Sequence, residues 1–511
     1  MKIMYIPLDE RPCNYQYPSM IAGLKDDIEL IIPPLDLLGK KKEEADTDRL
    51  WNWMKDNIVN CNAIVLSIEM FVYGGLVPSR IHHMSIDECL ERLQRIKLIK
   101  EINPGIKIYA SNLIMRTPSY NSSDEEPDYY GDYGKDIFTF GHLTDKEKRG
   151  IITPEEIKQI EALKNQIPSE YLNDYIERRK INLAINQAAI ILVKDGFIHF
   201  LSIPQDDCSE FGFTPMDHTV VERRISNWRL NFKIYNYPGA DEVGCTLLSR
   251  AYNEYYFRRP KVYTVYSSVY GPFIVPHLED RPIGESVKAH ITAAGGWIAD
   301  SPDESDFILL INTPGKEMQA SIYQKEKDIT YSSYRNLREF AENIKKYIIQ
   351  GKKCVVADVA FINGGDTELV YMMDDLNIMD HLYGYAGWNT VCNTMGTAIA
   401  TGLIGYDSNN DNERIYNLAF RFMEDWCYQS IVRQDVTLNE IQNINGGSTS
   451  LGDNENKITA VIKDRLNRHW SEHIKNSFKD FDIVVDKVYA PWHRMFEIGM
   501  DMYVQPKKYW F

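Results

Sequence analysis

Short runs of apolar residues alternate along the chain with longer stretches in which apolar residues recur at helical spacing. Most of the short runs are apolar at nearly every position, which is typical of strands that are covered on both faces. In chain order, we expect strands at 2–8, 29–32, 63–68, 107–113, 197–203, 261–266, 307–311, 354–359 and 381–385.

Amphipathic helical stretches fall between these runs, at 86–102, 154–165, 171–195 and 334–350 among others. This repetition of strand and helix predicts an α/β fold with parallel strands and right-handed crossovers. We expect a (β/α) barrel-like catalytic region over residues 1–400, followed by a mostly helical C-terminal region over 401–511. Two packed α/β domains, divided near residue 260, are the alternative.

Residues 121–150 are rich in Asn, Ser, Asp, Tyr and Gly, and they follow the predicted strand at 107–113. A long loop at the end of a strand is a common place for a lid over a site. A solvated insertion with no role in function is an equal alternative.

The composition of the 511-residue chain is that of a globular protein, with 44% hydrophobic and 25% charged residues. The net charge of −16 would repel nucleic acid. The eight cysteines form no C-x-x-C pair, and neither a signal peptide nor a run of 18 apolar residues is visible. We therefore expect a cytoplasmic protein that binds a small molecule, with a sugar as the expected substrate, and neither nucleic acid nor a membrane; its oligomeric state stays open.

Candidate functional residues collect after the predicted strands. In parallel α/β folds, ligands bind beyond the carboxyl ends of the strands, so these positions converge in space. We expect a site that draws on Asp9, Glu10, Arg11, Glu69, Arg80, Arg116, Asp206, Asp207, Asp241, Glu242, Asp358, Tyr385, Trp388, Asn389 and Asn393. Individually, many of these acids suit helix caps or ion pairs equally well.

Four segments resemble motifs of the bacterial domain-of-unknown-function family 4127. They are Pro7-Leu8-Asp9-Glu10-Arg11-Pro12, Tyr73-Gly74-Gly75-Leu76 followed by Ser79-Arg80, Gly239-Ala240-Asp241-Glu242, and Tyr385-Ala386-Gly387-Trp388-Asn389-Thr390 with Asn393. The resemblance covers essentially the whole chain but implies no function. It leads one to expect Asp where this chain has Glu69.

The adjacent acids Asp206 and Asp207 are similar, more distantly, to the catalytic pairs of retaining N-acetylhexosaminidases such as family 84 glycoside hydrolases and of hyaluronidases. On that resemblance, Asp206 would orient the substrate's acetamido group and Asp207 would be the general acid. Asn389 would then bond a sugar hydroxyl, with Trp388 or Tyr385 as a stacking surface.

Other interpretations stay open. Arg11, Arg80 and Arg116 would suit an anionic substrate, but such arginines more often pair with neighbouring carboxylates. Asp241 and Glu242 are typical of acids at the N-terminus of a helix.

The segment from His469 to His473 has the H-x-x-E-H spacing of a zinc site, yet an amphipathic surface helix explains it better. No Gly-rich phosphate cradle is visible, and we expect neither a metal nor a cofactor.

The first hypothesis is therefore a glycoside hydrolase. The alternatives are a metal- or Arg-assisted hydrolase or lyase acting on a small anionic metabolite, and a sugar-binding protein without catalysis.

Overall fold

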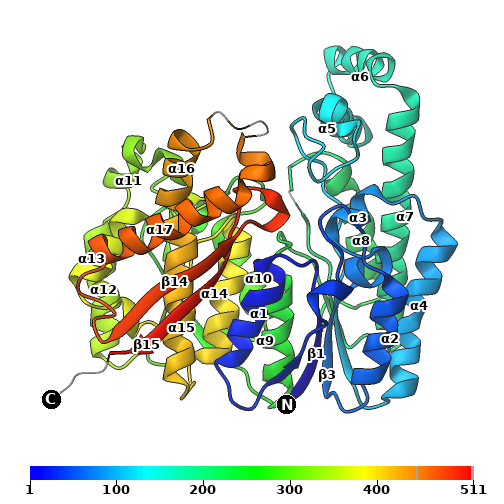
Figure 1. The fold of residues 1–511 in the computed structure, drawn as a ribbon. Helices are drawn as coiled ribbons and strands as arrows, with labels where there is room; N and C mark the ends of the chain where they lie inside the picture. The colour runs from blue at the N-terminus through cyan, green and yellow to red at the C-terminus, as the bar shows by residue number, and fades with distance from the viewer. Residues whose placement is uncertain (207, 443, 445–446, 508–511) are drawn as a thin grey trace. The chain divides into compact units, whose positions relative to one another are not determined.

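A computed structural model describes residues 1–206, 208–442, 444 and 447–507 (Figure 1). The chain forms two compact units, which we describe separately. Unit 1 contains Met1–Glu10, Glu29–Leu247 and Leu278–Asp280. Unit 2 contains Arg11–Ile28, Leu248–His277 and Arg281–Phe511.

Unit 1 is built on a six-stranded, wholly parallel sheet with the strand order β2-β1-β3-β4-β5-β6. Its strands are β1 (Lys2–Ile6), β2 (Glu29–Ile31), β3 (Ala63–Ser67), β4 (Lys107–Ser111), β5 (Phe200–Ser202) and β6 (Ile234–Tyr235). Its helices are α2 (Thr47–Asn57), η2 (Glu69–Tyr73), α3 (Leu76–Ile81), α4 (Ile86–Ile102), α5 (Tyr130–Lys148), α6 (Pro154–Gln166), α7 (Ser169–Lys194) and α8 (Phe213–Asn227). Helix α9 (Val243–Tyr255) begins in unit 1 and ends in unit 2.

Unit 2 is built on a five-stranded, wholly parallel sheet with the order β13-β11-β9-β7-β8. Its strands are β7 (Lys261–Tyr266), β8 (Trp297–Ile298), β9 (Phe307–Asn312), β11 (Cys354–Asp358) and β13 (Gly384–Ala386). Smaller pairs are formed by β10 (Gln319–Ala320) with β12 (Phe361–Ile362), and by the antiparallel β14 (Phe481–Tyr489) and β15 (Gly499–Pro506). The longer helices are α1 (Pro12–Gly23), α10 (Ile283–Ala293), α12 (Leu337–Ile349), α13 (Thr367–Asp375), α14 (Val391–Gly405), α15 (Asp411–Arg421), η6 (Phe422–Val432) and α17 (Glu455–His473); shorter ones are η4 (Ser321–Glu326), α11 (Thr330–Ser333) and α16 (Arg433–Asn439).

The two sheets share one topology. Numbered in chain order within each unit, the strands run 2-1-3-4-5-6 in unit 1 and 2-1-3-4-5 in unit 2. In this doubly wound arrangement the chain reverses direction across the sheet between the first and third strands, and ligands bind beyond the carboxyl ends of the strands there. In each unit, we therefore expect a functional site at the carboxyl edge of the sheet, near this reversal point.

The prediction of parallel strands in an α/β fold is confirmed, but the barrel is wrong. Among the described residues the strands form open sheets, with β2 and β6 at the edges of one and β13 and β8 at the edges of the other. The alternation of strand and helix is the same in both architectures. A barrel and an open sheet differ in the direction in which successive crossovers move across the sheet. Hydrophobic periodicity does not encode that direction.

The predicted element positions are mostly confirmed, as for α4 and β11. The predicted loop over 121–150 is wrong in its second half, where α5 forms. Tyr130, Ile137 and Phe140 of this helix are buried in a cluster with residues of α6 and α7, and that burial outweighs the helix-disfavouring glycines.

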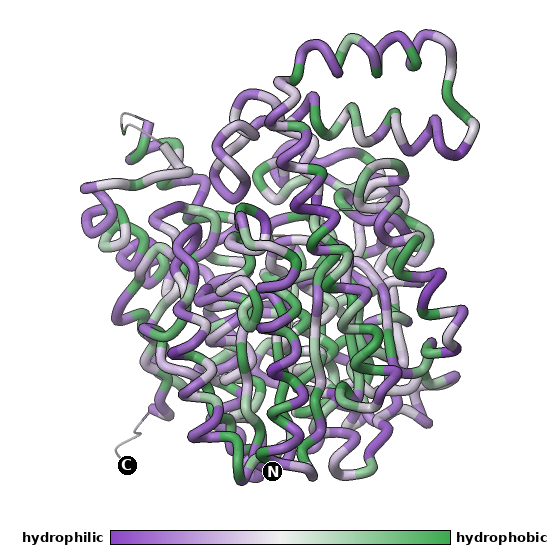
Figure 2. Tube along the Cα trace, turned by 90° about the vertical axis from the view of Figure 1, so that its right-hand side faces the viewer, coloured by the Kyte–Doolittle hydropathy of each residue, from purple (hydrophilic) through white to green (hydrophobic). Residues whose placement is uncertain are grey.

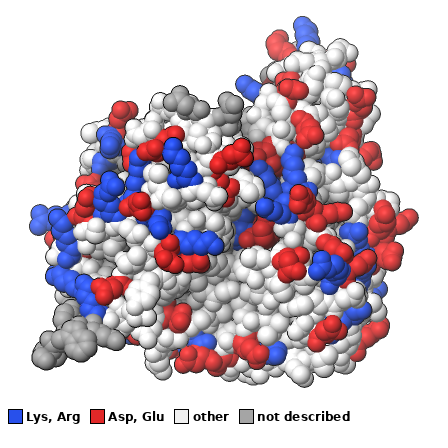
Figure 3. Space-filling view, viewed as in Figure 1, with Lys and Arg blue, Asp and Glu red and all other residues white. Residues whose placement is uncertain are grey.

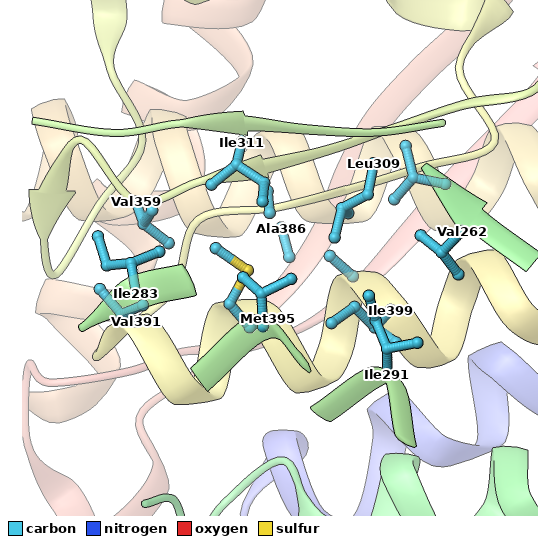
Figure 4. Close-up of a cluster of buried hydrophobic side chains, with 14 of the residues drawn as sticks. Val262, Ile283, Ile291, Leu309, Ile311, Val359, Ala386, Val391, Met395 and Ile399 are labelled. Carbon is cyan, nitrogen blue, oxygen red and sulfur yellow. The ribbon is translucent and has the colours of Figure 1, made fainter. Parts of the chain in front are cut away.

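Each core is made by one apolar side of the surrounding helices. In unit 2, α10 and α14 supply Ile283, Ile291, Met395 and Ile399, which pack against β9 residues such as Leu309 (Figure 4). Figure 2 shows the alternation that produces such helices: hydrophilic and hydrophobic residues follow one another along the helices at the top of the view.

Candidate functional site

A small cavity lies at the carboxyl edge of the unit-1 sheet. It is bordered by residues that follow three neighbouring strands: Glu69 after β3, Asn112 after β4 and Asp206 after β5. Arg80 of α3 and Asn182 of α7 also line the cavity, as do the hydroxyl-bearing residues Tyr73 and Ser79. The cavity volume is about 10 Å³, which is room for roughly one water-sized group. The sequence prediction that acids at strand ends converge therefore holds for Glu69 and Asp206.

Glu69 is the buried acid of this cavity. It opens a π-helical turn, η2, directly after β3; such turns are rare and often occur at functional sites. One carboxylate oxygen, Oε1, accepts hydrogen bonds from Asn112 Nδ2 and from the backbone N–H of Leu113, both at 2.8 Å. The other, Oε2, accepts one from Ser67 Oγ at 3.2 Å. Burial raises the pKa of Glu69 to about 7, although these hydrogen bonds act to lower it.

Asp206 has a different environment. Its Oδ2 accepts a hydrogen bond of 2.6 Å from Arg80 Nη2, and Arg80 is itself buried. A buried guanidinium next to a carboxylate holds the negative charge in place. Glu69 and Asp206 thus border one cavity, with one carboxyl buried among neutral donors and the other in an ion pair.

Arg80 and Arg116, the two predicted site arginines of unit 1, are bound to carboxylates from the loop that follows β4. Glu125 Oε2 accepts from Arg80 at 2.9 Å and from Arg116 at 3.0 Å. Glu126 Oε1 accepts from Arg116 Nε at 2.8 Å, and burial raises the pKa of Glu126. With Asp206, three carboxyl groups surround two guanidinium groups, so this cluster has no surplus positive charge for an anionic substrate.

The other predicted residues of unit 1 do not border this cavity. Glu10 accepts from the backbone N–H of Lys41 at 3.0 Å, and Asp9 is buried. Asp241 and Glu242 are buried just before α9, where Glu242 Oε2 accepts from the backbone N–H of Ala240 at 3.0 Å. Asp207, the predicted general acid, lies outside the described residues.

A second acid with a raised pKa lies in unit 2. Asp358, the last residue of β11, has no exposed surface and accepts hydrogen bonds from Asn312, the backbone N–H of Asp366 and the Tyr385 hydroxyl at 2.9, 2.8 and 3.1 Å. Burial, followed by the charge of Asp366, raises the pKa of Asp358 to about 7. Arg335 Nη1 donates to Asp366 at 2.7 Å. Asp358 itself borders none of the cavities described here, whereas Asp366 of the same network lines a groove of unit 2.

A further buried charge cluster is carried by the π-helix η6. Asp425 pairs with Arg421 and accepts a hydrogen bond of 2.7 Å from the backbone N–H of Gly387, just after β13. Its neighbour Glu424 accepts from Gln429 at 2.9 Å. Burial, and next the charge of Asp425, raises the pKa of Glu424 well above its ordinary value.

The remaining predicted residues of unit 2 have structural contacts. The Arg11 guanidinium lies 4.3 Å from the ring centre of Trp492. Trp388 is buried and meets Phe496 edge-on at 6.1 Å, so it offers no exposed stacking surface. The backbone carbonyl of Asn389 accepts from Asn363 N–H at 3.0 Å, and Asn393 lies in the first turn of α14.

Several residues of these networks were missed by sequence reasoning. Asn112 ends a predicted strand and could have been found by the same rule that found Glu69. Glu125 and Glu126 lie in a polar loop, Arg335 lies between α11 and α12, and Arg421 and Asp425 lie in helices. Their sequence context is that of surface residues, so only burial identifies them.

The charged surface gives no further focus. On the face shown in Figure 3, Lys and Arg side chains are interspersed with Asp and Glu. Within the described ranges, no group of three or more His, Cys, Asp or Glu side chains is arranged to hold a metal ion. No helix in the same residues has both the length and the apolar character needed to cross a bilayer.

The chain belongs to the family described as protein of unknown function DUF4127, whose model matches residues 3–501. The family resemblance of the four motifs is thereby confirmed. A search of curated proteins finds no match. The more distant resemblance to family 84 glycoside hydrolases has no support in these comparisons.

Proposed function

We propose that this protein is a hydrolase that cleaves a small glycoside at the carboxyl edge of the unit-1 sheet, with Glu69 as the general acid and Asp206 as the fixed carboxylate. One observation carries the proposal. The two acids border one cavity, yet Glu69 has a pKa of about 7 while Asp206 is ion-paired with Arg80. Two carboxyl groups with such different environments are the usual arrangement for acid-catalysed glycoside cleavage.

The chemistry follows from these environments. Protonated Glu69 donates its proton to the glycosidic oxygen as the bond from that oxygen to the anomeric carbon breaks. Asp206 stabilises the positive charge that develops on the sugar ring. Water then adds to the anomeric carbon, and its proton returns to Glu69, so the products are a free sugar and an alcohol. The water-sized cavity suits the reacting oxygen, and the rest of the substrate lies outside it.

The lining favours this chemistry over acyl transfer. Ser79 is the hydroxyl-bearing residue of the cavity other than Tyr73, and its Oγ donates to the Leu76 carbonyl at 2.6 Å. An activated serine would instead donate to a general base such as histidine. The alternative of an anionic substrate is weakened as well, because Arg80 and Arg116 are already bound to carboxylates.

A panel of aryl glycosides, including N-acetylglucosaminides, tests the proposal. We expect release of the aryl alcohol by the native protein and a loss of about 10²- to 10⁴-fold in kcat for Glu69→Gln. This variant keeps the local structure, because the glutamine oxygen accepts from Asn112 and Leu113 while its amide donates to Ser67. Asp206→Asn, which weakens the pair with Arg80, is expected to lose about 10²-fold or more.

The matched control is Glu91→Gln, an exposed acid on α4, which should leave kcat unchanged. The proposal fails if no glycoside in the panel is hydrolysed, or if Glu69→Gln is as active as the native protein. Loss of activity in Asp207→Asn with full activity in Glu69→Gln would return the acid role to Asp207.

A further inference from the structure

Unit 2 has a groove that no part of the proposed hydrolase site uses. It lies between η4, the start of α13, the η6–α16 segment and the last turns of α17. Its volume is about 650 Å³. Sites for small organic molecules typically span about 300–1,000 Å³, so the groove is large enough for a complete ligand.

The acidic groups that line this groove are all paired. Asp366 pairs with Arg335 at 2.7 Å, and Asp435 pairs with Arg465 at 2.6 Å. Glu368 pairs with Lys327. Lys325, by contrast, forms no ion pair with the residues that the structure describes. Among the described residues, Lys325 is therefore the charged side chain of the lining that has no ion-pair partner.

Two histidines on one side of α17 also line the groove. His469 and His473 are one helical turn apart, with ring centres 4.7 Å from each other. Within the described part of the chain, His469 Nδ1 is buried and has no hydrogen-bond partner. Burial, and then the neighbouring His473, lowers the pKa of His469, which favours the neutral form of its ring.

Part of the remaining lining is aromatic or aliphatic. Tyr371 of α13 stacks on His473 with 5.5 Å between ring centres and 22° between the planes. Ile322 and Leu438 line the groove and are each about half exposed. Planar rings pack well on such a surface.

We propose that this groove binds a small organic anion that carries a planar ring. Lys325 pairs with the anionic group, and the ring packs against Tyr371 and the aliphatic side chains. The site is separate from Glu69 and Asp206, so its failure would leave the proposed hydrolase unaffected, and the reverse also holds.

Calorimetric titration of the full-length protein with phenyl phosphate tests this inference. Inorganic phosphate and phenol serve as the two halves of the probe. We expect a Kd of about 1 mM or tighter for phenyl phosphate, with each half binding about tenfold more weakly or worse. In a parallel NMR titration of a ¹³C-histidine-labelled sample, the ring signals of His469 and His473 should shift. Such shifts would locate the ligand in the groove.

Lys325→Gln should weaken phenyl phosphate binding about tenfold or more. The control Lys457→Gln changes an exposed lysine of α17 outside the groove and should bind as the native protein does. Equal weakening by both variants, absence of histidine shifts, or binding of inorganic phosphate or phenol as tight as that of phenyl phosphate would each overturn the proposal.

Discussion

Each unit places a buried acid at the carboxyl edge of a sheet with the same topology, but the two acids have different neighbours. Glu69 follows the third strand of one sheet and Asp358 ends the fourth strand of the other. Burial raises both pKa values to about 7. Glu69 borders a cavity that it shares with a second carboxylate, whereas Asp358 is enclosed by hydrogen-bond donors. A raised pKa therefore identifies burial, and only the adjoining space makes an acid a catalytic candidate.

The strongest test of this comparison is Arg335→Ala in unit 2. The Arg335 side chain is fully buried and pairs with Asp366, so its removal leaves a buried carboxylate without its counter-charge. We expect a loss of about 3–5 kcal/mol in the free energy of unfolding, measured by denaturant titration. Arg338→Ala, whose side chain is 83% exposed, should cost less than about 1 kcal/mol. If both variants lost the same free energy of unfolding, the pair between Arg335 and Asp366 would not stabilise the fold.

The second test follows the pH dependence of the unit-1 reaction. A general acid works while it is protonated, so the rate should be highest below the Glu69 pKa of about 7 and fall about tenfold per pH unit above it. Ser67→Ala removes a donor that stabilises the Glu69 carboxylate, which raises the Glu69 pKa and moves this decline to higher pH.

Ser111→Ala is the matched control, because Ser111 is the register partner of Ser67 on β4 and lies outside the Glu69 cavity. Its pH profile should coincide with that of the native protein. An unchanged profile in Ser67→Ala would mean that another group causes the decline.

The smallest effect is expected for Glu424→Gln. Because burial and the charge of Asp425 raise the folded-state pKa of Glu424 well above its ordinary value, the folded protein favours the protonated carboxyl, and an amide is a close substitute for it. We expect a change within about 1 kcal/mol in the free energy of unfolding at pH 7. A raised acid pKa reduces stability as pH rises above the unfolded-state value. The native protein should therefore lose more stability than the variant between acidic and neutral pH.

The adjacent residue is the contrast. Asp425 is ion-paired with Arg421, so Asp425→Asn should cost about 3–5 kcal/mol. If Glu424→Gln lost as much free energy of unfolding as Asp425→Asn, the predicted difference between a protonated Glu424 and an ion-paired Asp425 would be wrong.

The sequence predicted the carboxyl-edge acids because strand ends in a parallel sheet point to one side. Glu69 and Asp206 satisfied that rule and meet in one cavity. Trp388 also follows a strand, but its large apolar ring is buried against Phe496. Sequence reasoning could not distinguish the predicted residues that border the Glu69 cavity from those that do not. A different compact unit from that of Glu69 contains Arg11, Asp358, Tyr385, Trp388, Asn389 and Asn393.

The histidines of α17 show the same limit. Their i, i+4 spacing indicated one side of a helix, and the charged residues around them favoured a plain surface helix. Spacing alone did not reveal that the groove formed with η4 and α13 lies beside that side of the helix.

The sequence by itself determined the α/β class, the parallel strands and the family, since these depend on local periodicity and on short motifs. The tertiary structure decided the rest: two open sheets in place of a barrel, an enclosed Asp358 in one unit, a Glu69 that borders a cavity in the other, and a groove lined by His469 and His473. Strand order, burial and cavity shape arise from contacts between residues far apart in the chain, and such contacts leave no local pattern.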